Sequence, residues 1–553
     1  MTARRPPISH KPWAILSIGT VLIGAFSLSH TGPVLNIGGL PQALQFLRAS
    51  LHPDLSFDFL QIIIRATGVT FAYAVCGTLL SIAIGFLGGI LSSEIWWHAV
   101  WPNQAGRSVV RGLLAIPRAI HELIWGLVLV NLLGLDPLVA ILAITIPFSA
   151  IVAKVFSEIL DETPRAPMQL LVSAGVAPPS AVLYGLLPQA LPNLLSYSFY
   201  RFECALRSSA VLGIIGAGGL GYEIFLSLQS LRYEQLWTAF YALILLNGCV
   251  DAWSAAVRQR LGFVSRLALG LPQRKEPQDL GGRQSNWWIW SGIGLMGLLC
   301  FWFVGADWSL LWSGRTVRLL SELAASAIPQ VPTLAQGITL LQVSWQTVVM
   351  SLLASILASM GGLVLSLPAA RGFLLPKGLL GTMASETPWA VAVGKFGYVG
   401  TRLFLLVSRA VPAPIWALVF LFILFPGIWP GALALALHNL GILGRLMAEV
   451  NENTEQRSIR ALRIQGASAL QTLLYGLLPV TLPQFLAYSL YRWEVCLRAT
   501  VIVGLVGAGG LGRLMMEQIS SFDYGGLTLT LTIFVFLTIV VDSISAALRQ
   551  KLR

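Results

Sequence analysis

The sequence predicts an all-α, polytopic membrane protein with about twelve transmembrane helices, arranged as two parallel repeats of six. Composition is the first observation: 56% of the 553 residues are hydrophobic and 11% are charged, whereas an average soluble domain has about 25% charged residues. Second, apolar runs of roughly 20 residues recur along the chain, each long enough to cross a bilayer core as a helix. Third, the second half of the chain repeats the first.

Each half supplies six apolar runs, which are the expected spans. In the first half they are residues 13–29, 68–92, 112–133, 137–156, 192–217 and 236–256. In the second half they are residues 287–304, 339–366, 403–425, 429–448, 483–508 and 527–546. Because both counts are even, the two halves share one orientation and are related by an axis along the membrane normal.

Basic residues between the apolar runs set the orientation. They gather in three places: Arg4, Arg5 and Lys11; Arg258, Arg260, Arg266, Arg274, Lys275 and Arg283; and Arg549, Lys551 and Arg553. The positive-inside rule places all three in the cytoplasm, so both chain termini are expected there, while residues 30–65 and 305–336 face outward. This pattern accounts for the net charge of +12, and no nucleic-acid partner is expected.

The first apolar run, Trp13 to Leu28, follows a basic start and has two interpretations. It is a secretory signal peptide or a retained helix, and the retained helix is favoured because no small-residue cleavage site follows. The cysteines have no CxxC spacing, so neither a disulfide framework nor a metal site is expected. They are Cys76, Cys204, Cys249, Cys300 and Cys496.

The repeat is clearest at an offset of 291 residues. Residues 175–221 and 466–512 align without a gap, with 24 of 47 positions identical. Near the second helix the best offset falls to 269, which pairs Thr70 with Thr339 and leaves about 22 extra residues in the second half, around 371–402.

The repeat also sets the expected domains. The first unit is residues 1–256 with a core at 60–256, and a cytoplasmic linker covers 257–286. The second unit is residues 287–553 with a core at 335–546.

A polar segment separates the fourth and fifth spans of each half, at about residues 158–190 and 449–482. In the second copy, apolar Ile459, Leu462 and Ile464 alternate with Arg457, Arg460 and Arg463 before Gly466 breaks the pattern. The pattern predicts two short amphipathic helices joined by a glycine turn. The alternative is an ordinary pair of surface helices lying on lipid headgroups.

The fifth span carries full charges at the middle of the membrane. Glu203 lies about 17 Å along the helix from Pro192. Helical spacing places Tyr197, Tyr200, Glu203 and Arg207 on one side, and likewise Tyr488, Tyr491, Glu494 and Arg498. Glu203 with Arg207, and Glu494 with Arg498, are four residues apart and are expected to form buried ion pairs.

Four further arginines have no such partner nearby in sequence: Arg201, Arg492, Arg118 and Arg409, unless Glu122 serves Arg118. Because charges in the membrane normally face a cavity or an interior, and guanidinium suits phosphate-like oxygens, some of these arginines are candidates for stabilising an anion in transit. The candidate translocation path comprises Arg118, Arg201, Glu203, Arg207, Arg409, Arg492, Glu494, Arg498, Tyr200 and Tyr491.

The sequence GAGGLG ends the fifth span in both halves. It matches a dinucleotide loop, but no strand precedes it, so the glycines are expected to break the helix or to allow close helix contact. They are Gly216, Gly218, Gly219, Gly221, Gly507, Gly509, Gly510 and Gly512.

The polar segments resemble the coupling loops of ABC importer permeases, with the pattern EAAxxxG, nine residues and then IxLP. Their glycine-to-LP spacing is kept by Gly175, Leu187 and Pro188, and by Gly466, Leu478 and Pro479. The second copy retains Ala461 but has Leu462 at the next position; Gln169 and Arg460 replace the glutamate, and Gly185 and Gly476 replace the isoleucine. Pro178 and Pro179 interrupt the first copy, so the two contacts with an ATPase are expected to be unequal.

Together with YRFE or YRWE and GAGGLG, this loop resembles the permeases of phosphonate ABC importers, here as two permease units fused in tandem. The resemblance implies the type I importer permease fold in the bacterial cytoplasmic (inner) membrane. It implies a cytoplasmic ABC ATPase homodimer, which carries the ATP and Mg, and an extracytoplasmic substrate-binding protein. The cargo would be phosphonate, phosphite or phosphate.

Two other classes remain open. A secondary transporter with twelve helices would show the same helix count and symmetry, and an ABC permease for another small solute would share the loops. A membrane enzyme is disfavoured because no nucleophile and base are close in sequence and the histidines lack paired spacing. No catalytic residue is expected, and no lysine is followed by Ser or Thr as an ATP-binding loop requires.

Overall fold

The computed structural model describes residues 34–100, 105–260, 287–326, 332–374, 388–454, 461–504, 507 and 509–552. Within these ranges the chain is helical without a β-strand, and Leu35 and Leu424 form an isolated antiparallel bridge. The expected first span, the basic residues at 4–11, most of the link at 257–286 and the segment 455–460 lie outside the described residues.

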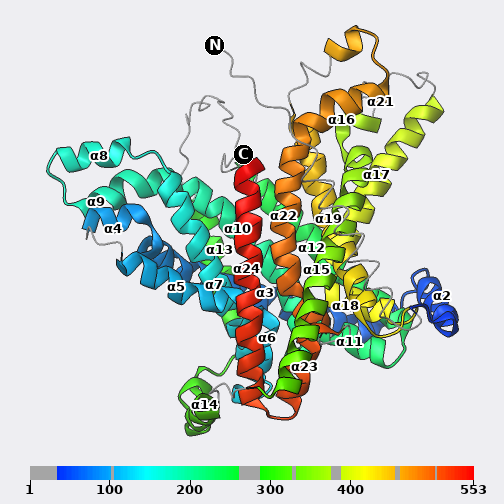
Figure 1. Cartoon of the computed structure of the whole chain (residues 1–553), viewed down its shortest axis with the longest axis horizontal. Coiled ribbons are helices and arrows are strands. Elements are labelled where there is room, and N and C mark those ends of the chain that lie inside the picture. Colours follow the sequence, from blue (N-terminus) through cyan, green and yellow to red (C-terminus); the bar gives the residue numbers. More distant parts are fainter. Residues whose placement is uncertain are drawn as a thin grey trace. The chain divides into compact units, whose positions relative to one another are not determined.

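Figure 1 shows the helices in chain order. In the first half they are α2 (Leu40–Ala49), α3 (Phe57–Ser92), α4 (Glu94–Val100), α5 (Ala105–Ala119), α6 (Glu122–Leu133), α7 (Pro137–Glu162), α8 (Ala166–Ser173), α9 (Pro178–Ala181), α10 (Leu187–Leu212), α11 (Leu220–Gln229) and α12 (Tyr233–Arg260). In the second half they are α13 (Trp287–Val304), α14 (Gly314–Ser326), α15 (Leu334–Ala369), α16 (Arg371–Leu374), α17 (Pro388–Ala410), α18 (Ala413–Phe420), α19 (Ile428–Asn453), α21 (Ala469–Gln471), α22 (Leu478–Val503), α23 (Gly510–Ser520) and α24 (Tyr524–Leu552).

The chain forms two compact units, each described here by itself. One contains residues 45–328 and 410–412, and the other contains residues 1–44, 329–409 and 413–553. The units depart from the sequence halves at α13, which opens the second half but packs against α3 in the unit of residues 45–328. Phe303 of α13 lies 3.5 Å from the position that a Cβ atom on Gly68 would occupy.

One long helix pair forms the centre of each unit: α3 with α7, and α15 with α19 (Figure 1). Glycine allows the close approach, because a Cβ atom on Gly85 would stand 2.6 Å from Val152 Cγ1. In the other unit a Cβ atom on Gly362 would stand 3.1 Å from Leu443 Cβ. At these positions glycine lets the two helix backbones approach closely, and a larger side chain would clash with the neighbouring helix.

The third span of the first half is broken, contrary to the continuous helix expected at 112–133. α5 ends at Ala119, α6 begins at Glu122, and the two helices are bent by 82°. His121 caps α6, since its Nδ1 accepts a hydrogen bond from Leu123 N at 3.3 Å. The run expected at 403–425 is also interrupted, because α17 ends at Ala410 and α18 ends at Phe420.

Eight helices of the described residues are long and apolar enough to span a membrane, and two bent pairs could raise that number to ten. The chain is therefore a multi-pass membrane protein. The total of twelve stays a prediction, because the first expected span lies outside the described residues and α13 has only a short apolar stretch within them.

The hydrogen bonds correct the alignment of the second helix. Thr70 Oγ1 accepts a hydrogen bond from Leu220 N at 2.8 Å, and Thr347 Oγ1 accepts one from Leu511 N at 2.9 Å. The structural counterpart of Thr70 is thus Thr347, at an offset of 277, and not Thr339 at 269. Compared with the offset of 291 elsewhere, the second half carries 14 additional residues instead of 22. The two alignments differ by eight residues, which is about two helical turns. Both place apolar residues on nearly the same face of the helix, so the sequence did not distinguish them.

Candidate coupling segments and membrane-embedded charges

The segment after α7 consists of two short helices joined by a glycine turn. α8 ends at Ser173, and Gly175 follows with φ of +85°, a left-handed conformation that glycine adopts readily. Val176 N donates to Leu171 O at 3.0 Å, which closes the C-terminal end of α8. α9 then begins.

Pro178 and Pro179 occupy the first turn of α9. They were expected to interrupt the segment, but they start a helix, because residues in a first turn need no intrahelical N–H donor.

The second copy repeats the turn. Residues 461–464, which include Ala461 and Leu462, are helical, and Gly466 again has φ of +85°. Ala467 N donates to Leu462 O at 3.1 Å, as Val176 does to Leu171 in the first copy. Ser468 caps α21 and exchanges hydrogen bonds with Gln471. Both copies therefore share one backbone design.

The glycine that replaces isoleucine in the first copy has a packing explanation. Gly185 lies in a π-helical turn (Val182–Leu186) against α8, and a Cβ atom there would stand 2.9 Å from Met168 Cα. A side chain at this position would push α8 away. Leu187 and Pro188 begin α10, just as Leu478 and Pro479 begin α22.

The glycines of both GAGGLG segments lie where the fifth helix breaks. In the first half Gly216, Gly218 and Gly219 have φ between +76° and +91°, and α11 leaves at 54° to the preceding helix. In the second half Gly507, Gly509 and Gly510 have φ between +74° and +100°. A Cβ atom on Gly221 would stand 1.8 Å from Ala210 O, and one on Gly512 would stand 2.1 Å from Val501 O. The two breaks thus have the same construction.

The buried arginine of α22 is held by an amide. Arg492 is 8% exposed, and its Nε donates to Asn439 Oδ1 at 2.7 Å; its Nη2 donates to the same oxygen. The amide nitrogen of Asn439 lies 3.0 Å from Cys496 Sγ. α19 and α22 are therefore joined by a polar contact inside their own unit.

The buried arginine of α10 is held by an aromatic ring. Arg201 is also 8% exposed, and its guanidinium carbon lies 3.8 Å from the centroid of the Phe148 ring on α7. Phe148 and Asn439 are 291 residues apart, as are Arg201 and Arg492.

The prediction of an ion pair between Glu494 and Arg498 is wrong. Glu494 Oε1 accepts a hydrogen bond from Arg549 Nη1 of α24 at 2.6 Å, while Arg498 Nε lies 3.4 Å from the backbone oxygen of residue 494. A partner 55 residues away fits because α22 and α24 pack side by side. In the other copy Glu203 is buried, and its expected ion pair with Arg207 stays a prediction.

The remaining path candidates occupy varied environments. Arg118 and Arg409 are half-buried in the last turns of α5 and α17, just before the breaks. Tyr200 lies 5.9 Å from Tyr197, ring to ring, whereas Tyr491 is 46% exposed.

A protein family matches both halves of the chain. Residues 85–263 and 378–553 match the family described as the binding-protein-dependent transport system inner membrane component. The chain belongs to this family. Its members are transport components, so the chain is a membrane permease whose family domain occurs twice.

Three relatives of this permease illustrate the family. The phosphate-import permease PhnE of Mycolicibacterium smegmatis is 28% identical over 82% of this chain and 79% of the relative. The phosphite permease PtxC of Stutzerimonas stutzeri is 29% identical over 51% of this chain and 97% of the relative. The putative cryptic phosphonate permease PhnE2 of Escherichia coli is 36% identical over 21% of this chain and 97% of the relative.

Glu122, which the sequence offered only as a possible partner of Arg118, has Ser208 and His121 as its neighbours in the structure. Glu122 Oε1 accepts from Ser208 Oγ at 2.6 Å, and its Oε2 lies 3.0 Å from His121 Nδ1. The second half has Ala413 and Ala499 at the positions of Glu122 and Ser208. The adjacent histidine and glutamate in an apolar run were the available signal.

Proposed function

We propose that this permease forms the membrane pathway of an ATP-driven importer for a phosphorus oxyanion: phosphate, phosphite or a phosphonate. A separate pair of cytoplasmic ATPases binds ATP and Mg and contacts the two glycine-turn segments. An extracytoplasmic binding protein delivers the anion. The chain termini lie in the cytoplasm of a bacterial cell.

The observation that carries the coupling role is the repetition of one two-helix segment at the same place in both halves. Gly175 and Gly466 share the same backbone angle, and each segment leads into an LP helix start. Exposed apolar side chains mark both segments, because Leu170 is 71% exposed and Ile464 is 87% exposed. Such side chains suit a protein partner better than water.

The substrate class is supported by the names of the relatives and by charge. PhnE, PtxC and PhnE2 are described for phosphate, phosphite and phosphonate. Buried Arg201 and Arg492, with Arg118 and Arg409 at the helix breaks, supply positive charge within the helix bundles. Guanidinium groups stabilise phosphate-like oxygens through paired hydrogen bonds.

The test reconstitutes the permease with its ATPase and binding protein in vesicles. ATP should drive uptake of phosphate, phosphite or methylphosphonate, and the Gly175→Val/Gly466→Val variant should hydrolyse ATP without uptake, since valine disfavours positive φ. Gly134→Val, at another positive-φ turn outside these segments, is the matched control.

Two results would reject the proposal. Uptake driven by an ion gradient in vesicles without the ATPase would establish a secondary transporter. Uptake of another solute, with none of the three anions transported, would refute the substrate class. The Arg201→Gln/Arg492→Gln variant tests the anion path, and unchanged uptake by a correctly inserted protein would remove both residues from it.

A further inference from the structure

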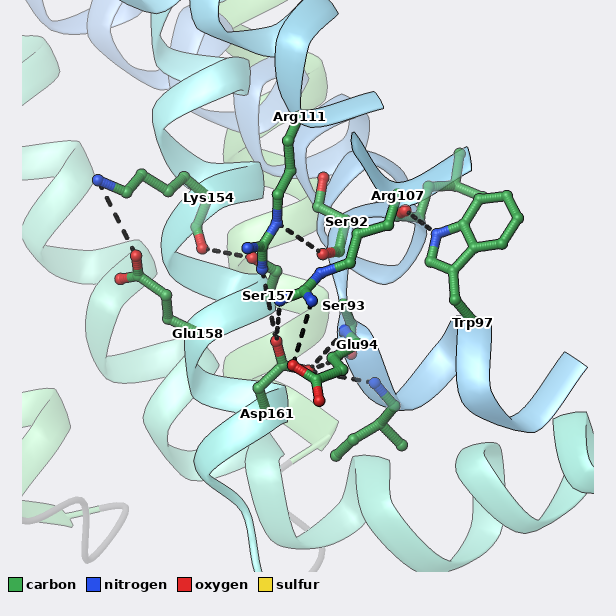
Figure 2. Close-up of polar contacts among 12 residues, drawn as sticks. Ser92, Ser93, Glu94, Trp97, Arg107, Arg111, Lys154, Ser157, Glu158 and Asp161 are labelled. Atoms are coloured by element: carbon green, nitrogen blue, oxygen red, sulfur yellow. Dashed lines mark hydrogen bonds and ion pairs between the residues drawn. The ribbon is translucent and has the colours of Figure 1, made fainter. Parts of the chain in front are cut away.

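A carboxylate at the end of α7 ties together three helices. Asp161 Oδ1 accepts a hydrogen bond from Ser93 Oγ at 2.6 Å and from Glu94 N at 2.8 Å, where the chain turns from α3 into α4 (Figure 2). Arg111 of α5 completes the contact: its Nε donates to Ser92 O at 3.1 Å, and its Nη2 lies 3.5 Å from Asp161 Oδ2. One carboxylate and one guanidinium thus join α3, α5 and α7.

The second half contains the same junction. Glu452, in the last turn of α19, accepts a hydrogen bond from Arg371 N at 2.8 Å and from Arg402 Nη2 at 2.7 Å. Arg402 Nε donates to Ala369 O, the last residue of α15, at 3.0 Å. The carboxylates and the arginines are each 291 residues apart, and the backbone partners are 277 apart. We name the two sets, Asp161 with Arg111 and Glu452 with Arg402, the arginine junctions.

The residues beside the junctions have diverged, although the junctions have not. In the first half Arg107 Nη1 pairs with Glu94 Oε2 at 3.1 Å. At the matching positions of the second half, Arg371 Nε donates to the hydroxyl of Tyr398 at 3.4 Å. Glu94 of the first half corresponds to Arg371 of the second, and Arg107 corresponds to Tyr398. The contact between carboxylate, guanidinium and helix end is nevertheless present in both halves.

Their place in the chain indicates what the junctions do. Asp161 lies in the last turn of α7, five residues before α8, and Glu452 is the residue before the end of α19, ahead of the segment around Gly466. A planar guanidinium that binds a carboxylate and a carbonyl together holds one geometry. Isolated ion pairs at this exposure contribute little to stability, so stability alone does not account for the repetition.

We propose that the arginine junctions are positioning elements that make α5, and α17 in the other half, move with the coupling segments when the ATPase acts. The inference rests on the proposed function, because it assumes that the segments transmit force. Asp161 and Glu452 receive the movement at the ends of α7 and α19. Arg111 and Arg402 pass it to α5 and α17 and to the ends of α3 and α15.

The first test removes the charge from both carboxylates. In the reconstituted importer, with phosphate and phosphite as probes, Asp161→Asn/Glu452→Gln should raise the ATP hydrolysed per anion imported about five-fold, the lower end of the range typical of allosteric coupling. The control is Glu158→Gln/Glu449→Gln, which breaks the pairs with Lys154 and Arg445 about one turn earlier on the same helices. The control should keep the wild-type ratio. Equal ratios in the two variants would overturn the proposal.

A second measurement does not require transport. Spin labels at Ser173 and Val109 report the distance between the coupling segment and α5 in the complex with the ATPase. With intact junctions, adding ATP should leave this distance unchanged, because the two parts move together; in Asp161→Asn/Glu452→Gln it should change. A distance that responds to ATP in the wild-type chain, or that stays fixed in the variant, would refute the junctions. Absence of ATP-driven uptake by the wild-type chain would instead refute the proposed function.

A milder variant covers the case in which the first fails to assemble. Arg111→Lys/Arg402→Lys keeps both charges but loses the Nε bond to Ser92 O and Ala369 O. The ratio of ATP to anion should rise as for the carboxylate variant but by a smaller factor, because an ammonium keeps the charge without the planar fork. A wild-type ratio in this well-assembled variant would count against the role of the arginines.

Discussion

The two halves of the permease hold the same buried charges in different ways. Arg201 and Arg492 occupy equivalent positions and are equally buried, yet one lies over the Phe148 ring and the other binds the carbonyl oxygen of Asn439. The equivalent helices, α7 with α10 and α19 with α22, place the two arginines at equivalent positions. An aromatic face and an amide are alternative solutions for the same cation, so divergence has altered the partner and kept the charge.

The largest expected effect concerns Glu494, which follows Arg492 by two residues in α22. Arg549→Gln should lower the free energy of unfolding by about 3–5 kcal/mol, because it leaves buried Glu494 without its cation. Thermal unfolding in detergent measures the effect. Arg498→Gln is the control, since among the described residues its Nε contacts a backbone oxygen at 3.4 Å, and it should cost about 1 kcal/mol. If the two variants lost equal stability, the assignment of Arg549 as the partner would fail.

A second pair of variants compares Asn439, which contacts Arg492, with Phe148, which contacts Arg201. Asn439→Leu should destabilise the protein by about 3 kcal/mol, because the Arg492 guanidinium loses its acceptor in a buried site. Phe148→Leu keeps an apolar contact and should cost about 1–2 kcal/mol through the lost cation–π contact. Midpoints of denaturant unfolding in detergent give both values. A larger loss for Phe148→Leu would reverse the comparison.

The smallest expected difference lies at the helix breaks. Gly219→Ala and Gly510→Ala both introduce a side chain at positive φ, but the new Cβ would stand 2.5 Å from Thr70 Oγ1 in the first case and 2.9 Å from Thr347 Oγ1 in the second. Gly219→Ala should therefore lose more stability than Gly510→Ala, by about 1 kcal/mol. Gly134→Ala, with positive φ and open space, measures the backbone contribution alone. Equal losses in all three would show that the contacts with threonine are irrelevant.

The fold class and the repeat could be predicted from the sequence because they depend on local properties. Apolar runs identify the long helices, and a glycine between two amphipathic runs predicts the turns at Gly175 and Gly466, both of which have positive φ. The 82° break between α5 and α6 had a signal in the sequence, because Arg118, His121 and Glu122 interrupt the apolar run at this point. The length of the run favours one continuous span, so the change of direction at the His121 cap was missed.

The side-chain partners could not be predicted, since they depend on which helices become neighbours. A spacing of four suggested Glu494 with Arg498, whereas the chain returns through α24 and brings Arg549 to the same carboxylate. The arginine junctions were hidden for the same reason. Asp161 and Arg111 are 50 residues apart, and an apparent offset of 269 instead of 277 displaced their backbone partners.

The packing of α13 on α3 determines where the chain can be divided. A cut within residues 257–286, which the repeat suggests as a natural boundary, would leave α13 and α14 on the fragment that carries the second half, although both belong to the compact unit of residues 45–328. Neither fragment would then contain a whole unit, and the first could regain α13 only from the second. Co-expressed fragments should consequently assemble through this helix, whereas the first fragment made alone would present a bare surface along α3.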